Sequence, residues 1–350
     1  MSLDLTFLER LLSAPGASSF ESRPAEAFRA HAQEVGLDTE RDAYGSIFAI
    51  ANRGAGPKLL LSGHIDEIGL LITHVDDDGF AWIKAVGGWD PVQLVGQRVR
   101  VVSRDTETVG LIGKKPIHLM SAEDRRKTTK IEDLFIDVGA SGRDDADEVV
   151  RPGDFAVVEQ PLVRLRNGRI ASKAIDDRIG AYVALETARR AIGAGCEVIA
   201  SATVQEEIGG VGAAAASYAW EPDVALAIDV THATDVPGIS KKQEGDHPLG
   251  SGPELSVGSY VHRGVLQALR DVAEAEGIAV TIGTAPRRTG TDADFLAKVR
   301  GGVPSAVVSI PNRYMHSPNE MVDPRDVEAT IALLTAFARG LAARVPIAQP

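Results

Sequence analysis

The chain of 350 residues contains a single cysteine, Cys196, which excludes an intrachain disulfide and a zinc site built from cysteine sulfur. Basic residues are outnumbered, 37 against 49 acidic ones, and the net charge of −12 argues against a nucleic-acid-binding protein. No segment approaches the ~18 consecutive apolar residues of a membrane span. The N-terminus carries Asp4 and Glu9 where a signal peptide would be positively charged. We therefore expect a cytoplasmic protein that binds neither nucleic acid nor membrane.

Hydrophobic residues make up 44% of the chain and charged residues 25%, which is typical of a globular protein, and the length favours two domains. Short apolar runs of the kind found in strands buried on both faces of a sheet occur at 59–61, 198–204, 224–228 and 306–310. Apolar residues at helical spacing predict helices at 5–14, 21–36, 177–193, 262–276 and 326–344. Strands that alternate with helices predict a layered α/β domain.

The stretch from about 70 to 164 has a different pattern. Short alternating runs punctuated by glycine and proline occur at 80–86, 99–102, 134–138 and 155–158. They predict a small antiparallel β-barrel or sandwich inserted into the α/β domain. We expect a discontinuous α/β domain at 1–70 and 164–350, and an inserted β-domain at 71–163. The polar segment 121–130 within the insertion is predicted to be a surface loop.

Side chains that can bind metal follow the buried runs, and they should meet because the carboxyl ends of strands in open α/β sheets form binding sites. They occur at the motifs His64-Ile65-Asp66-Glu67, Asp176-Asp177, Gln205-Glu206-Glu207, Ile228-Asp229 and Met315-His316-Ser317. Each motif alone has an ordinary explanation, such as a helix cap, a loop histidine or surface charge. Five such coincidences at one sheet edge are improbable, so the sequence predicts a functional site.

Two histidines with several carboxylates and no sulfur suit zinc, cobalt or manganese. A pair of metal ions needs a carboxylate shared between them. His64 and Asp66 are two residues apart, so in an extended chain they point the same way and Asp66 can hold the imidazole from behind. Glu206 and Glu207 are neighbours whose side chains diverge, so one can bind metal while the other addresses a water molecule.

The order and spacing of these motifs resemble the M42 family of dinuclear metal aminopeptidases, the tetrahedral aminopeptidases that include glutamyl aminopeptidases and proteins once labelled endoglucanase M. The resemblance covers nearly the whole chain and rests on the motifs Gly63–Gly69, Asp176–Gly180, Gln205–Gly209, Ala227–Val230, Gly245–Pro253, Thr289–Ala293 and Met315–Ser317. It implies a layered α/β zinc-peptidase domain with an inserted β-barrel. It also implies hydrolysis of the N-terminal residue of peptides.

The resemblance further implies two divalent metal ions per subunit, Zn²⁺ first and Co²⁺ second. The implied residues are His64 and Asp229 on one metal, Glu207 and His316 on the other, Asp176 as the bridge, Glu206 as the general base and Asp66 as the residue that orients His64. The bridging aspartate often precedes a cis peptide bond in this family, and the loop at Thr291-Asp292 would lie near the substrate. The family normally assembles as a tetrahedral dodecamer built from dimers that form through the inserted domain.

Three alternatives remain beside the aminopeptidase interpretation. An endoglucanase needs two carboxyl groups facing each other across a sugar and no metal. A related amidohydrolase or carboxypeptidase would use the same metal cluster on another substrate, and a non-catalytic assembly subunit would need none of it. The sequence leaves the preferred N-terminal residue open. The basic residues that could border the site and favour an acidic one, or simply carry surface charge, are Lys241, Lys242, Arg263, Arg287 and Arg288.

Overall fold

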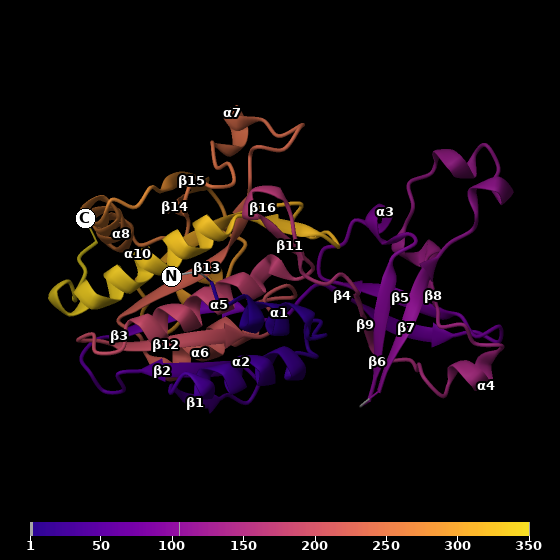
Figure 1. Cartoon of the computed structure of the whole chain (residues 1–350), viewed down its shortest axis with the longest axis horizontal. Coiled ribbons are helices and arrows are strands. Elements are labelled where there is room, and N and C mark those ends of the chain that lie inside the picture. Colours follow the sequence, from indigo (N-terminus) through magenta and orange to yellow (C-terminus); the bar gives the residue numbers. More distant parts are fainter. Residues whose placement is uncertain (1–2, 105, 350) are drawn as a thin grey trace.

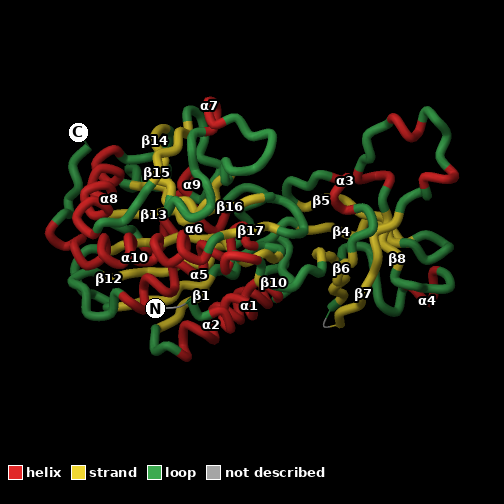
Figure 2. Tube along the Cα trace, turned by 45° about the horizontal axis from the view of Figure 1, so that its top comes forward, coloured by secondary structure: helices red, strands yellow, loops and turns green. Residues whose placement is uncertain are grey.

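The computed structural model describes residues 3–104 and 106–349, so the outermost residues of the expected domains and Asp105 lie outside the described part. Figure 1 shows a large part in which helices cover a twisted sheet, and a smaller all-β part that extends from one end of it. Figure 2 shows the same separation after a 45° turn. The predicted fold class, an α/β layer structure with an inserted antiparallel β-barrel, is confirmed.

The large sheet has four parallel strands at its centre, in the order β12, β3, β13 and β16. They span Glu197–Thr203, Lys58–His64, Val224–His232 and Ser305–Arg313, and each contains or overlaps one of the predicted apolar runs. On one side the sheet continues through β2 (Ile47–Ala51) to β1 (Asp38–Arg41). On the other side it continues through β17 (Glu320–Val322) and β11 (Ile170–Ser172) to β10 (Val163–Arg164). The strands β14 (Glu254–Gly258) and β15 (Thr281–Ala285) extend it from β16.

The five predicted helices are present, with ends that differ by a few residues from those expected. They are α1 (Leu5–Ser13), α2 (Ser22–Glu34), α5 (Ile175–Arg190), α8 (Arg263–Glu276) and α10 (Pro324–Gly340). The helix α6 (Val211–Trp220) was not predicted, because its sequence VGAAAASYAW has no apolar stripe that stands out against a polar face. The short helices α7 (Lys241–Glu244) and α9 (Ala293–Leu296) lie in connections. None of the described helices combines the length and apolar character that a bilayer crossing requires.

Glycine allows α5 to pack closely on β3. A Cβ atom on Gly63 would lie 2.2 Å from the backbone nitrogen of Ala181, and one on Gly180 would lie 2.4 Å from a carboxylate oxygen of Asp177. Only residues without a Cβ fit these two positions. The contact places the first turn of α5, with Asp176 and Asp177, beside the carboxyl end of β3.

The inserted part is a closed barrel, which resolves the choice between barrel and sandwich that the sequence left open. Its strands follow the order β4 (Gly69–Val75), β5 (Ala81–Val86), β8 (Phe135–Asp137), β7 (Thr106–Gly113), β6 (Arg98–Ser103) and β9 (Phe155–Val158). A separate apolar core fills it. The short helices α3 (Pro91–Leu94) and α4 (Arg143–Ala146) lie in its connections, and residues 114–133 between β7 and β8 form a mostly exposed excursion that contains the predicted surface loop 121–130.

Candidate active site

The strand ends bring the predicted metal ligands together. His64 is the last residue of β3, Asp229 lies within β13, and Asp176 lies in the first turn of α5. Glu207 follows β12, and His316 follows β16. Donor atoms of His64, Asp176 and Glu207 lie within 4.8 Å of one another, a spacing at which one metal ion could contact all three.

Asp176 stands between the two histidines. Its Oδ1 lies 3.1 Å from Nε2 of His64, and its Oδ2 lies 3.4 Å from Nε2 of His316. Nε2 of His316 is also 3.2 Å from Oε1 of Glu207. One carboxylate therefore turns one oxygen toward each imidazole, which is the arrangement that a carboxylate shared between two metal ions requires. The peptide bond between Asp176 and Asp177 is cis, as the resemblance implies.

The other ring nitrogen of each histidine is held from behind. Nδ1 of His64 lies 3.1 Å from the carbonyl oxygen of Asp66 and 3.3 Å from its Oδ1. Nδ1 of His316 lies 2.9 Å from the carbonyl oxygen of Gly88. Because these oxygens accept a hydrogen bond from Nδ1–H, each ring keeps the lone pair of Nε2 for the centre of the cluster. The predicted contact between Asp66 and His64 is therefore present in the structure.

A second group of potential ligands comprises His64, Asp177 and Asp229, again with donor atoms within 4.8 Å. The sequence motif contained Asp177, but we did not predict it as a ligand. Its two oxygens accept hydrogen bonds from the backbone nitrogens of His64 and Gly180, each at 3.1 Å. Asp229 uses Oδ1 to accept from the nitrogen of Val230 at 2.7 Å, and its Oδ2 has no hydrogen-bond donor among the described residues. Asp229 is thus better placed than Asp177 to bind a metal ion.

The buried carboxylates of the cluster create an electrostatic field that favours a bound cation. Burial, with the nearby charge of Asp176, raises the pKa of Asp229 well above its ordinary value. Burial, with the charges of Asp229 and Asp292, raises the pKa of Glu206 to about 10. Hydrogen bonds to Asp176 and Glu207 raise the pKa of His316 to about 11. Among the described residues, no lysine or arginine forms an ion pair with any of these five carboxylates. A field that favours a proton this strongly also favours a divalent cation in its place.

Two further carboxylates fix the backbone around the cluster. Asp66 accepts hydrogen bonds from the backbone nitrogens of Glu206 and Glu207, at 3.1 and 3.2 Å, and from Oγ of Ser18 at 2.7 Å. Glu320 accepts from the nitrogens of Asp176 and His316, at 2.8 and 2.9 Å. Sequence reasoning missed Glu320, because it lies in a three-residue strand that no motif marks.

Glu67, which follows Asp66 in its motif, lines a small cavity together with Asp176, Glu207 and His316, but it is paired with two cationic side chains. Its carboxylate lies 2.6 Å from Nζ of Lys173 and 3.0 Å from a guanidinium nitrogen of Arg178. All three side chains are buried, and the arginine also donates to the carbonyl oxygens of Leu11 and Ile65. This ion network joins α1, the loop after β3 and the start of α5 beneath the site.

Non-glycine residues with left-handed backbone conformation gather at the site. Gln205, directly before the two glutamates, has a φ of 60°, His316 has 58°, and Ala174 before α5 has 55°. Such residues cost about 1–3 kcal/mol each and persist where surrounding contacts hold them. Here the carboxylate of Glu320 holds the backbone nitrogen of His316, and the carboxylate of Glu21 holds that of Gln205.

The two residues of the Thr291-Asp292 loop lie in different environments. Asp292 is buried, and its Oδ2 accepts hydrogen bonds from Oγ of Ser62 and Oγ1 of Thr203, at 2.7 and 2.6 Å. Its Oδ1 is buried without a hydrogen-bond partner. Thr291 instead lines a cavity of about 180 Å³ beside the carboxyl end of β13. A substrate contact by this loop therefore remains a prediction, and Thr291 is the residue in a position to make it.

The basic residues named from the sequence are dispersed. Lys241 pairs with Asp246 at 2.7 Å on the exposed loop around α7, and Lys242 and Arg287 are exposed. Arg263 begins α8 beside the first residue of β16, at the sheet edge opposite the cluster, so the idea that it borders the site is wrong. Arg288 does line the cavity beside β13.

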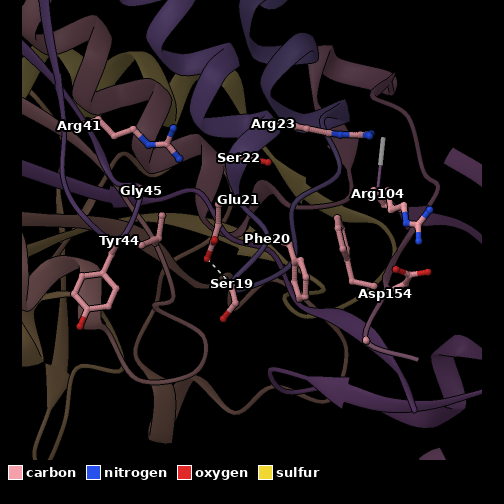
Figure 3. A pocket seen from close by; sticks show the side chains of 14 residues that line it. Ser19, Phe20, Glu21, Ser22, Arg23, Arg41, Tyr44, Gly45, Arg104 and Asp154 are labelled. Carbon is pink, nitrogen blue, oxygen red and sulfur yellow. Dashed lines mark hydrogen bonds between the residues drawn. The ribbon is translucent and has the colours of Figure 1, made fainter. Parts of the chain in front are cut away.

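A larger cavity, of about 350 Å³, lies elsewhere between the α/β part and the barrel (Figure 3). Glu21, Arg41 and Arg104 contribute to its walls. The carboxylate of Glu21 accepts hydrogen bonds from the backbone nitrogens of Ser19 and Gln205, at 2.7 and 3.1 Å. None of the predicted ligands lines this cavity, so it is distinct from the cluster.

Comparisons with known proteins agree with this geometry. Residues 45–333 match the family model described as M42 glutamyl aminopeptidase. The chain is 34% identical to lysyl aminopeptidase of Pyrococcus furiosus, over 96% of each chain. Among solved structures it resembles a TET aminopeptidase from a marine-sediment thaumarchaeote, with a TM-score of 0.92, 33% identity and 96% of each chain covered. It also resembles the TET1 peptidase of Pyrococcus horikoshii, described as able to assemble into a tetrahedron or a large octahedral shell, with a TM-score of 0.84, 31% identity and coverage of 95% of this chain and 98% of that one. The resemblance inferred from the motifs is therefore confirmed: the chain belongs to the M42 family of aminopeptidases, and it is a peptidase.

Proposed function

We propose that this chain uses two divalent metal ions to remove the N-terminal residue of peptides. The observation that carries the proposal is the position of Asp176, with one carboxylate oxygen toward Nε2 of each histidine. We assign His64 and Asp229 to one ion, Glu207 and His316 to the other, and Asp176 to both. The set contains only imidazole nitrogen and carboxylate oxygen, which suits Zn²⁺ first and Co²⁺ second.

Divalent cations at this position supply polarisation of the scissile carbonyl and acidification of a water molecule. The remaining steps fall to the side chains. Oε2 of Glu206 lies 4.0 Å from Nε2 of His64, beside the metal ligands but outside the assigned set. Glu206 takes the proton from the attacking water and delivers it to the leaving amine. Asp66 acts as a positioning residue, because it holds both the ring of His64 and the backbone of Glu206.

The alternative functions fit the site less well. Hydrolysis of a glucan needs two carboxyl groups about 5–9.5 Å apart with space for the sugar between them. Within each of the two groups of possible ligands, the donor atoms lie within 4.8 Å of one another, which is closer than that spacing. An amidohydrolase or carboxypeptidase would use the same ligands, so it is distinguished by substrate. In a subunit without activity, the burial of several carboxylates of like charge would have no function, so this alternative also fits the site less well.

A substrate panel tests this function. Purified protein loaded with Zn²⁺ or Co²⁺ is assayed on aminoacyl-p-nitroanilides, their N-acetylated forms and carboxymethylcellulose. We expect turnover of the free-amine substrates only, with loss in a chelator and recovery on adding metal. Turnover of the acetylated substrates alone would indicate the amidohydrolase alternative, and turnover of the cellulose derivative without metal would indicate a glycosidase.

We further propose that the protein assembles as a tetrahedral dodecamer of dimers, with dimer contacts made by the inserted β-domain at 71–163. The similarity to the TET1 peptidase supports a homo-oligomer. The barrel extends away from the α/β part, so its surface is accessible to another subunit (Figure 1). The expected cytoplasmic location and the absence of nucleic-acid or membrane partners stay predictions.

The proposed dodecamer predicts a molecular mass that can be measured in solution. With a chain of 37.0 kDa, light scattering on the intact protein should give about 440 kDa for twelve subunits. Deletion of residues 72–160 with a short bridging linker should leave a smaller species whose circular dichroism retains the α/β signal. A deletion variant that still forms the same number of subunits would contradict the role of the barrel.

A further inference from the structure

A cavity of about 180 Å³ lies on the face of the sheet that carries Asp229. Thr231, two residues after Asp229 in β13, lines it together with Ser309 of β16. Asp229 and Ser309 are directly opposite in the parallel pairing of these strands, and Ser309 is opposite Glu254 in the antiparallel pairing with β14. Opposite residues point to the same face of a sheet. The cavity therefore lies next to Asp229, and its volume is below that of sites for drug-sized ligands, so it accommodates about one side chain.

Glu254 is the buried charge in the wall of this cavity. The residue is only 5% exposed, and its two carboxylate oxygens accept hydrogen bonds from the hydroxyls of Ser256 and Thr231, each at 3.0 Å. Gly283 faces it, and a Cβ there would lie 1.8 Å from Oε1 of Glu254, so any larger residue would displace the carboxylate. Two strand spacings of about 4.8 Å separate the backbones of Asp229 and Glu254. A long side chain attached near the metal-ligand cluster could therefore reach Glu254.

The carboxylate of Glu254 has no fixed counter-charge among the described residues. The nearest candidate is His247, whose Nε2 lies 3.6 Å from Oε2 of Glu254. That nitrogen is 3.1 Å from the carbonyl oxygen of Glu244, to which it must donate, while Nδ1 can accept from the hydroxyl of Thr281 at 2.8 Å. Both contacts are satisfied by a ring that donates through Nε2 and accepts at Nδ1.

The remaining charged groups of the cavity lie at its rim. Glu244 and Arg288 are exposed to solvent, where their charges are screened, and His232 is exposed as well. For a side chain inserted to the full depth of the cavity, Glu254 is closer than Arg288 and lies in a region of lower dielectric. Its electrostatic interaction with the end of that side chain is therefore stronger than that of the Arg288 guanidinium.

We propose that this cavity receives the side chain of the substrate's N-terminal residue and that Glu254 selects a cationic one, lysine or arginine. This inference rests on the proposed aminopeptidase function and names its substrate class. The four methylenes of lysine would lie along Thr231 and Val307, and the ammonium group would pair with the carboxylate between the two hydroxyls. It names a preference that the sequence left open.

The test compares substrates that differ in charge but little in shape. Wild-type protein with Zn²⁺ or Co²⁺ is assayed on lysyl-, norleucyl- and glutamyl-p-nitroanilide, because norleucine has the chain of lysine without the ammonium group. We expect kcat/KM for the lysyl substrate to exceed that for the norleucyl substrate by about 30-fold or more. Glu254→Gln should remove most of this ratio while norleucyl turnover changes less than about threefold. Glu244→Gln, on the exposed rim, is the matched control and should keep the ratio.

The outcomes separate this inference from the function on which it rests. Equal rates on lysyl and norleucyl substrates, or a preference for the glutamyl substrate that Arg288→Gln abolishes, would overturn the role of Glu254 while leaving the aminopeptidase function intact. Absence of turnover on all three substrates would instead contradict the proposed function. The wild-type lysyl-to-norleucyl ratio tests the inference even if the Glu254→Gln protein does not fold.

Discussion

Glu206→Gln should lower turnover by about 10²–10⁴-fold while the protein keeps its full metal content, because proton transfer contributes that much to rate. The substitution preserves the shape of the side chain, and the backbone nitrogen of Glu206 remains bonded to Asp66. Substrate should still bind, since the proposed contacts of the α-amine and carbonyl do not involve this carboxylate. Metal content by elemental analysis and kcat on an aminoacyl-p-nitroanilide, measured on one preparation, check the prediction.

Its matched control is Glu207→Gln at the neighbouring position. Oε1 of Glu207 lies 3.2 Å from Nε2 of His316, so loss of its charge should deplete one of the two ions. The pair of variants thus separates proton transfer from metal binding. Depleted metal in Glu206→Gln with full metal in Glu207→Gln would mean that the two roles are exchanged.

Asp176→Asn should have the largest effect on metal binding. Both oxygens of Asp176 face an imidazole, so the amide replaces an anionic donor to both proposed ions at once. We expect a loss of affinity beyond the about 10–100-fold that removal of an outer-shell partner typically causes, together with loss of turnover. Competition with a fluorescent chelator gives the two dissociation constants.

Asp66→Asn provides the graded comparison, because Asp66 contacts His64 from behind and is not an assigned ligand. Its loss of affinity should stay within about 10–100-fold. His64→Ala and His316→Ala should each lower the metal count per chain. Unchanged affinity at both positions in Asp176→Asn would contradict the assignment of this residue as the bridge.

Much of the fold could be predicted from the sequence because its pattern is local. The apolar runs of β3, β12, β13 and β16 are bounded by glycine or charge, and each leads to a polar residue at the same sheet edge. Because these polar residues lie at the same edge of one sheet, His64, Asp229 and Glu207 come close together. The helix α6 escaped prediction because its alanine-rich sequence has no polar face, and closure of the barrel depends on pairing β9 with both β4 and β6.

The residues that the sequence did not reveal act across long separations. Glu320 reaches the backbone of Asp176, 144 positions earlier in the chain, and Gly88 in the barrel holds the ring of His316. Glu254 is a single acidic residue in a strand, and it gains significance only through the register of β14 on β16. Asp177 stood in a recognised motif, but its contact with the backbone of His64 depends on the packing of α5 against β3. No periodicity encodes such contacts.

The central claim is that this cluster holds two divalent ions on which peptidase activity depends. The most direct test is the metal stoichiometry of the intact chain during re-metallation. Protein stripped with a chelator is titrated with Zn²⁺, and bound metal by elemental analysis and turnover of an aminoacyl-p-nitroanilide are followed on the same samples. Our account predicts that binding saturates at two ions per chain and that full activity requires both. Full turnover of the stripped protein, or saturation at fewer than two ions per chain, would contradict it.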